Sequence, residues 1–270
     1  MSNPVFDKSP VFSERPPSGV TNPGAQATAA YPATDAATLQ TMYDAPTATT
    51  RDTGRLTYDD VIIKTGGLFA VLLVAAAITW QLSDAMPGLW VGGMVVGLAL
   101  GLVNAFKRQP SPALILLYGV AEGVFLGGLS KVYNDWYDGI VVQAVLATFA
   151  TFAAALVLFR SGKVRVTPKF TRWLLVAMTG YLVFSLVNLV LVWTGVLGGW
   201  GLRGGGFGVV IGLLAVGMAA ASLLVDFDAI KRGVERGAPA KMAWSAAFGL
   251  VVTLIWLYTE ILRILAILRN

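Results

Sequence analysis

Five ionisable side chains lie inside stretches of sequence that are otherwise almost entirely apolar. They are Glu122 in YGVAEGVFLGGL, Asp226 and Asp228 in LVDFDAI, and Glu260 and Arg263 in LYTEILRIL. A charge near the centre of a hydrocarbon layer costs a few kcal/mol or more, so each group needs a partner, a cavity or a neutral protonation state. Acids in such places are typical of ion and proton pathways, and these five residues are the candidate site.

The two acids of LVDFDAI point to different sides of a helix, because two residues correspond to about 200° of rotation. Asp226 continues a stripe of small residues that suits a bundle interior: Gly212, Ala215, Ala219 and Ser222. Asp228 follows Leu224 and precedes the basic residues Lys231 and Arg232. We therefore expect Asp226 to face the interior, with Asp228 either a second gating carboxylate or a solvated one.

Glu260 and Arg263 are three residues apart, which is the spacing of an ion pair within one helix. A structural pair of this kind requires no further function. Alternatively, a carboxyl from another segment competes for Arg263 or shares a proton with Glu260. Both interpretations stay open from the sequence.

Glu122 is the most costly of these placements, near the middle of its apolar stretch. The glycines around it allow close approach of neighbouring helices: Gly119, Gly123, Gly127 and Gly128. The residue is either a packing carboxyl, protonated or hydrogen-bonded, or one that lines a pathway.

Seven apolar segments must position these side chains. Of the 270 residues, 56% are hydrophobic and 13% charged, whereas about 25% charge is usual in soluble domains. The segments are 61–83, 88–106, 111–133, 139–159, 172–196, 207–230 and 243–268, each near the ~20 residues needed to cross a bilayer. Proline and glycine separate them, as expected for breaks between helices. The sequence predicts an all-α polytopic membrane protein.

The absence of certain residue types excludes several activities. The chain has no cysteine and no histidine, which removes thiolate and imidazole catalysis and their metal sites. We expect no enzyme and no cofactor, although a protease using two carboxylates stays open. The chain has a net charge of +5, but its basic residues cluster in short loops between spans, so we expect a lipid bilayer and no nucleic acid as partner.

Basic residues alternate between the two sides of the predicted spans. One side holds Arg51, Arg55, Lys107, Arg108, Arg160, Lys163, Arg165, Lys169, Arg172, Lys231, Arg232, Arg236 and Lys241. The other holds only Lys131, Arg203 and Arg269. Since cytoplasmic loops are enriched in Lys and Arg, this predicts a cytoplasmic N-terminus and an extracytoplasmic C-terminus. In the alternative, six full spans precede a semi-penetrating last helix and both ends are cytoplasmic.

Residues 1–57 differ from the rest in composition. They hold seven of the twelve prolines, are rich in Ala, Thr and Ser, and show no sustained periodicity. A segment of this kind buries too little apolar surface to offset the entropy of ordering. We expect a disordered cytoplasmic tail at 1–57, retained in the mature protein, followed by the transmembrane bundle at 58–270.

Residues 58–270 resemble the Bax inhibitor family, in particular its bacterial, actinobacterial-type members. The likeness is carried by the seven-span layout, Asp226 followed four residues later by Ile230, the Leu257-Tyr258-x-Glu260 motif, and KVRVTPKFT at 163–171. The resemblance implies six helices around a central seventh. It also implies a proton-sharing pair of carboxylates, here Asp226 and Glu260, that gates a calcium leak.

The chemistry of such a pair follows from electrostatics. Two carboxyls within hydrogen-bond reach in a low dielectric cannot easily both ionise, so they share one proton. Loss of that proton leaves two repelling carboxylates, which could part the helices or attract Ca²⁺, an ion that prefers oxygen ligands. Glu122 is the next oxygen donor for a passing cation.

The spacing along the chain predicts a different arrangement. In a symmetric hairpin turning near Gly237, Asp226 is about 11 residues from the turn and Glu260 about 23. The mismatch is about 18 Å at 1.5 Å per residue. The two acids meet only if the last helix begins well below the membrane or the connection runs sideways.

Two function hypotheses follow. The first is a pH-sensitive leak channel or exchanger of the plasma membrane, with calcium or protons as the permeant ion. The second is a regulatory protein that binds or modulates a membrane protease or another membrane complex, in which the carboxylates are packing elements.

Overall fold

The computed structural model describes residues 54–270, which form seven long helices. They are α3 (Tyr58–Leu82), α4 (Leu89–Phe106), α5 (Pro112–Trp136), α6 (Ile140–Arg160), α7 (Pro168–Trp193), α8 (Gly205–Glu235) and α9 (Met242–Arg269). All seven are long and apolar enough to span a membrane. The predicted all-helical, seven-span fold is confirmed, and most helix ends lie within a few residues of the predicted ones.

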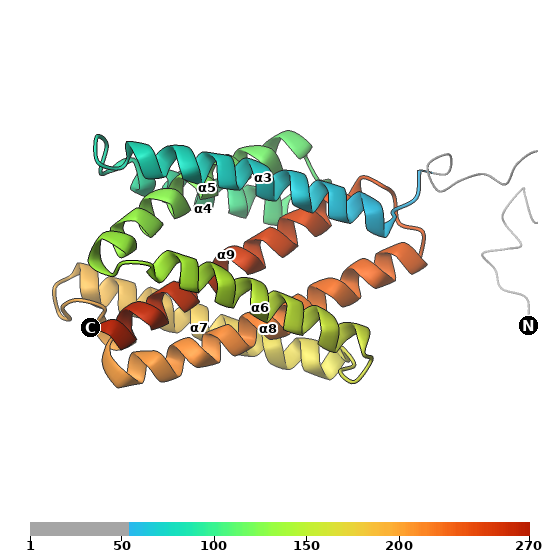
Figure 1. The fold of residues 1–270 in the computed structure, drawn as a ribbon. Coiled ribbons are helices and arrows are strands. Elements are labelled where there is room, and N and C mark those ends of the chain that lie inside the picture. The colour runs from blue at the N-terminus through green and yellow to red at the C-terminus, as the bar shows by residue number, and fades with distance from the viewer. Residues whose placement is uncertain (1–53) are drawn as a thin grey trace, which may run out of the picture. The chain divides into compact units, whose positions relative to one another are not determined.

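Helix α9 occupies the centre of the bundle. In Figure 1 it passes between α3, α4 and α5 on one side and α6, α7 and α8 on the other. It packs against α3, α5, α6 and α8 and is the most buried of the spans. The predicted central seventh helix is therefore present. Helices α4 and α7 are the outermost, because α4 packs on α5 and α7 packs on α8.

Glycines on α5 bring its backbone against α3. A Cβ atom at Gly123 or Gly127 would collide with the α3 backbone near Leu72 and Ala76. Side chains at either position would push the two helices apart, so the expectation of close approach around Glu122 is confirmed at these two positions. The closeness of α3 and α5 follows from the missing side chains.

A short segment before α3 is tied to the turn between α8 and α9. The backbone N–H of Leu56 donates to the carbonyl of Ala238 at 2.7 Å, and the N–H of Ala240 donates to the carbonyl of Gly54 at 2.8 Å. Thr57 then caps α3 in a reciprocal capping box with Asp60. We call residues 54–57 the strap.

The strap changes the expected boundary of the N-terminal tail. The sequence predicts disorder over 1–57, but residues 54–57 are ordered and the Leu56 side chain is 4% exposed. The reason is tertiary: the strap bonds to a turn far away in sequence, which local composition does not reveal. The remainder of the predicted tail, 1–53, lies outside the described residues.

Candidate functional site

The loop between α7 and α8 carries a basic residue into the bundle. The loop contains a single 3₁₀ turn, η1 (Gly201–Arg203). The Asn188 side chain of α7 holds this turn, because its Oδ1 accepts from the Leu202 N–H at 2.7 Å and its amide nitrogen donates to the Trp200 carbonyl at 3.3 Å. Gly201 has φ +58°, and a Cβ there would collide with Asn188. The turn thus fixes the point from which Arg203 extends.

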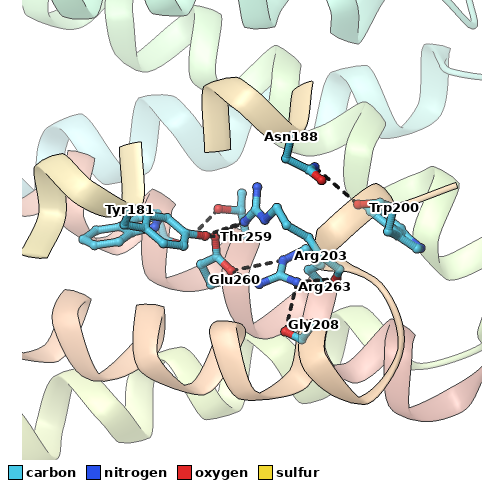
Figure 2. A network of polar contacts seen from close by, with 9 residues as sticks. Tyr181, Asn188, Trp200, Arg203, Gly208, Thr259, Glu260 and Arg263 are labelled. Carbon is cyan, nitrogen blue, oxygen red and sulfur yellow. Dashed lines mark hydrogen bonds and ion pairs between the residues drawn. The ribbon is translucent and has the colours of Figure 1, made fainter. Parts of the chain in front are cut away.

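Glu260 on α9 is the centre of a polar cluster formed with Tyr181, Arg203 and Arg263 (Figure 2). The Tyr181 hydroxyl and Arg203 Nη2 both donate to Glu260 Oε1, and Arg203 Nη2 also donates to the Tyr181 oxygen. Arg263 donates to the other carboxylate oxygen from Nε at 3.1 Å and from Nη2 at 2.6 Å. Both oxygens of Glu260 therefore have cationic partners.

Arg263 also ties α9 to the beginning of α8. Its Nη1 donates to the carbonyls of Arg203 and Gly208 at 3.0 and 3.3 Å. Arg263 and Glu260 are each 4% exposed. The structure forms the pair expected from their three-residue spacing. These hydrogen bonds compensate the cost of burying the two charges.

The Glu260 cluster has an excess of positive charge. Two guanidinium groups face one carboxylate, so the formal charge is +1 when Glu260 is ionised. A cluster of this composition is electrostatically unfavourable for a further cation. Its hydrogen bonds join α7, the α7–α8 loop, α8 and α9, so we call the cluster of Tyr181, Arg203, Glu260 and Arg263 the clamp.

Asp226 on α8 has quite different surroundings. Its Oδ2 accepts from Thr253 Oγ1 of α9 at 2.9 Å, and within residues 54–270 no Lys or Arg forms an ion pair with it. It lines a cavity of about 260 Å³ between α8 and α9. The cavity is lined by Leu56, Asp226, Ala229, Ile230, Gly233, Ala238, Met242, Ser245, Ala246 and Gly249.

The stripe of small residues that predicted the orientation of Asp226 is buried. Gly212, Ala215, Ala219 and Ser222 all lie inside the bundle. The expectation that this face of α8 points inward is confirmed.

The two carboxyls expected to pair, Asp226 and Glu260, are not joined in this structure. Asp226 bonds to Thr253, which precedes Glu260 by seven residues of α9, about 10 Å along the helix axis. Glu260 is bonded instead to the two arginines. The separation agrees with the hairpin spacing, since α9 begins at Met242, only a few residues beyond the turn. The pairing implied by the resemblance is corrected accordingly.

The other two predicted carboxylates occupy separate places. Asp228 forms an ion pair with Arg232 Nη2 at 2.9 Å, one turn further along α8, and its side chain is 19% exposed. The Glu122 side chain packs against Gly97 of α4, where an added Cβ would come within 2.7 Å of its Oε1. Glu122 thus lies at the interface of α4 and α5, outside both the Glu260 cluster and the Asp226 cavity.

Sequence reasoning missed Tyr181 and Arg203 as partners of Glu260. Arg203 is one of very few basic residues on its predicted side of the membrane, and that isolation between glycines was the available signal. Tyr181 gave none, because it is one of many aromatic residues in apolar spans. Within the described part of the chain no three acidic side chains gather where they could hold a metal ion.

Comparison with known proteins identifies the family. The family model described as Bax inhibitor 1 like matches residues 3–270, so the chain belongs to this family. A search of curated proteins finds no match.

Proposed function

We propose that this member of the Bax inhibitor 1-like family is a pH-sensitive cation leak channel or exchanger of the plasma membrane, with calcium as its principal ion. The observation that carries the proposal is Asp226, an acid that lines a cavity between α8 and α9 and whose one hydrogen-bond partner within residues 54–270 is the Thr253 hydroxyl. Carboxylate oxygen is the ligand type that Ca²⁺ prefers. The proposed function involves no catalysis.

The proton on Asp226 acts as the switch. When protonated, the carboxyl stays neutral beside Thr253 and the cavity stays dry. When the proton leaves, a negative charge is buried without a cation partner, which is costly in an apolar place. Entry of water or a cation relieves that cost, so the leak increases as pH rises. This role uses Asp226 alone and needs no second carboxylate.

In the proposed ion path, the Glu260 cluster blocks the end that lies away from the Asp226 cavity. Arg203 and Arg263 present a net positive charge beside α9, and a cation that moves along this helix from Asp226 meets that charge. Because Arg203 belongs to the α7–α8 loop, displacement of the loop removes one of the two positive groups. The leak therefore requires two events, ionisation at Asp226 and release at Arg203.

The positive-inside pattern gives this path a direction. With a cytoplasmic N-terminus, the Asp226 cavity lies toward the cytoplasm and the Glu260 cluster toward the outside. A reporter fused after Asn270 should read extracytoplasmic and one fused at Met1 cytoplasmic. Cytoplasmic readings at both ends would replace this direction with the semi-penetrating topology.

Calcium flux into liposomes tests the function. Purified protein is reconstituted around an internal calcium dye and assayed from about pH 6 to 8. Wild type should leak more at the higher pH, Asp226→Asn should lose the pH response, and Asp228→Asn should keep it. A wild-type protein that is folded but passes no calcium at any pH would overturn the proposal, as would a lost response in Asp228→Asn with a normal one in Asp226→Asn.

A regulatory role is the second candidate, and the complete pairing of Glu260 favours it. A carboxylate whose two oxygens are both bonded to arginines stabilises packing and offers no site for an ion. In this role the bundle binds or modulates a membrane protease or another membrane complex. Folded protein without flux, together with specific crosslinking to a membrane protease in cells, would favour this function over the leak.

A further inference from the structure

We propose that the strap, residues 54–57, is a lid on the Asp226 cavity and that the Leu56 side chain is its plug. The inference rests on the proposed function for its purpose, because a switch at Asp226 matters only if water and ions can reach it. Leu56 and Asp226 line the same cavity. The rest of its wall belongs to α8, α9 and the turn between them, so Leu56 is the one lining residue that the strap contributes.

Leu56 fits its position because α8 leaves space for it. Gly233 lies opposite, and a Cβ added there would come within 3.1 Å of Leu56 Cδ2. The side chain is almost completely buried although it belongs to no helix. The side chain therefore covers the part of the cavity that Gly233 lines.

Few contacts hold the strap in place. Two backbone hydrogen bonds join it to the turn, from Leu56 to Ala238 and from Ala240 to Gly54. A third hydrogen bond to the turn comes from α3 and not from the strap: Lys64 Nζ donates to the Ala240 carbonyl at 3.4 Å. Local opening of such a segment costs far less than global unfolding.

The strap also has a defined hinge. Helix α3 starts directly after Thr57, whose hydroxyl accepts from the Asp60 N–H at 3.1 Å. The Asp60 carboxylate in turn accepts from Thr57 Oγ1 at 2.8 Å. Because this capping box satisfies the first turn of α3 independently of the turn at 238–240, residues 54–56 of the strap can lift while Thr57 and the helix stay in place.

Cysteine accessibility measures the lid without measuring transport. The chain has no native cysteine, so Ser245→Cys introduces a single thiol into the cavity wall. The probe is a charged, membrane-impermeant methanethiosulfonate reagent. Labelling of this thiol should be slow with Leu56 present and at least about tenfold faster in Leu56→Ala, since truncation opens the cavity to water. Leu56→Met, which conserves volume, should keep the slow rate.

A second reporter separates opening of the lid from loosening of the bundle. Thr148→Cys places the thiol in a different apolar cavity, between α3, α5, α6 and α9. Its labelling rate should be the same with Leu56 and with Leu56→Ala. Equal acceleration at both reporters, or no acceleration at Ser245→Cys, would overturn the lid.

A reversible lock connects the lid to transport. Arg55 and Pro239 form an antiparallel bridge, a geometry whose Cα separation of about 4.5–5.5 Å suits a disulfide. The double variant Arg55→Cys, Pro239→Cys should pass little calcium when oxidised and recover on reduction. If Leu56→Ala accelerates labelling but no variant passes calcium, the lid stands and the proposed leak fails. If labelling is unchanged while Asp226→Asn still alters flux, the leak stands and the lid fails.

Discussion

Glu260 and Asp226 are both acids on neighbouring helices of the bundle core, yet their surroundings differ completely. Glu260 has two guanidinium groups and a phenol around it, whereas Asp226 has one threonine hydroxyl and a cavity. The difference teaches that the sequence position of a buried acid does not decide its role. The partners that neighbouring elements supply decide whether a buried acid is held by cations, as Glu260 is, or by a single hydroxyl group, as Asp226 is.

The largest effect is expected at the clamp. Glu260→Gln removes the carboxylate between Arg203 and Arg263 and leaves two cations facing each other, one buried (Arg263) and one partly exposed (Arg203). Breaking a buried pair in this way costs about 3–5 kcal/mol. Thermal unfolding in detergent should show this as a clear drop in midpoint, with Glu260→Asp as the control that keeps the charge. A variant as stable as wild type would show that the arginines do not depend on Glu260.

An intermediate effect is expected at Arg203. Arg203→Gln removes one cation and leaves Glu260 paired with Arg263, and the Arg203 side chain is partly exposed, so the loss should be about 1–2 kcal/mol. If the clamp acts as one unit, the double variant with Glu260→Gln should be less destabilised than the sum of the two single variants. Additive losses in the thermal unfolding series would mean that the two residues act independently.

The smallest effect on stability is expected at Asp226. Asparagine has nearly the same shape and keeps an oxygen that can accept from Thr253, so Asp226→Asn should change the free energy of unfolding by less than about 1 kcal/mol. The same thermal unfolding assay checks this value. A loss as large as that of Glu260→Gln would erase the contrast between the two acids and make Asp226 a structural residue as well.

Much of the fold follows from the sequence for simple physical reasons. Long apolar stretches must form helices in a bilayer, and prolines and glycines mark their ends, so the seven spans were predictable. The inward face of α8 followed from its stripe of small residues. The pair of Glu260 with Arg263 followed from helical spacing alone.

The partners of Glu260 outside α9 could not be predicted in this way. Arg203 reaches the acid because Asn188 holds a 3₁₀ turn in one conformation. That geometry depends on a loop and a helix meeting in space, which no periodicity records. The strap could not be predicted for the same reason, since the burial of Leu56 depends on a turn formed nearly at the other end of the chain.

The strap also bears on the order in which the protein is made. Lys64 and its partner Ala240 are 176 positions apart in the chain, and the strap bonds to the same turn. The six spans from α3 to α8 have therefore been synthesised before this contact can form. The N-terminal end of α3 therefore enters the membrane long before its partner turn is made, and the walls of the Asp226 cavity come together only when the α8–α9 hairpin packs against the strap. Closure of the bundle is thus a late step in biogenesis, and chains that stop before α9 lack it.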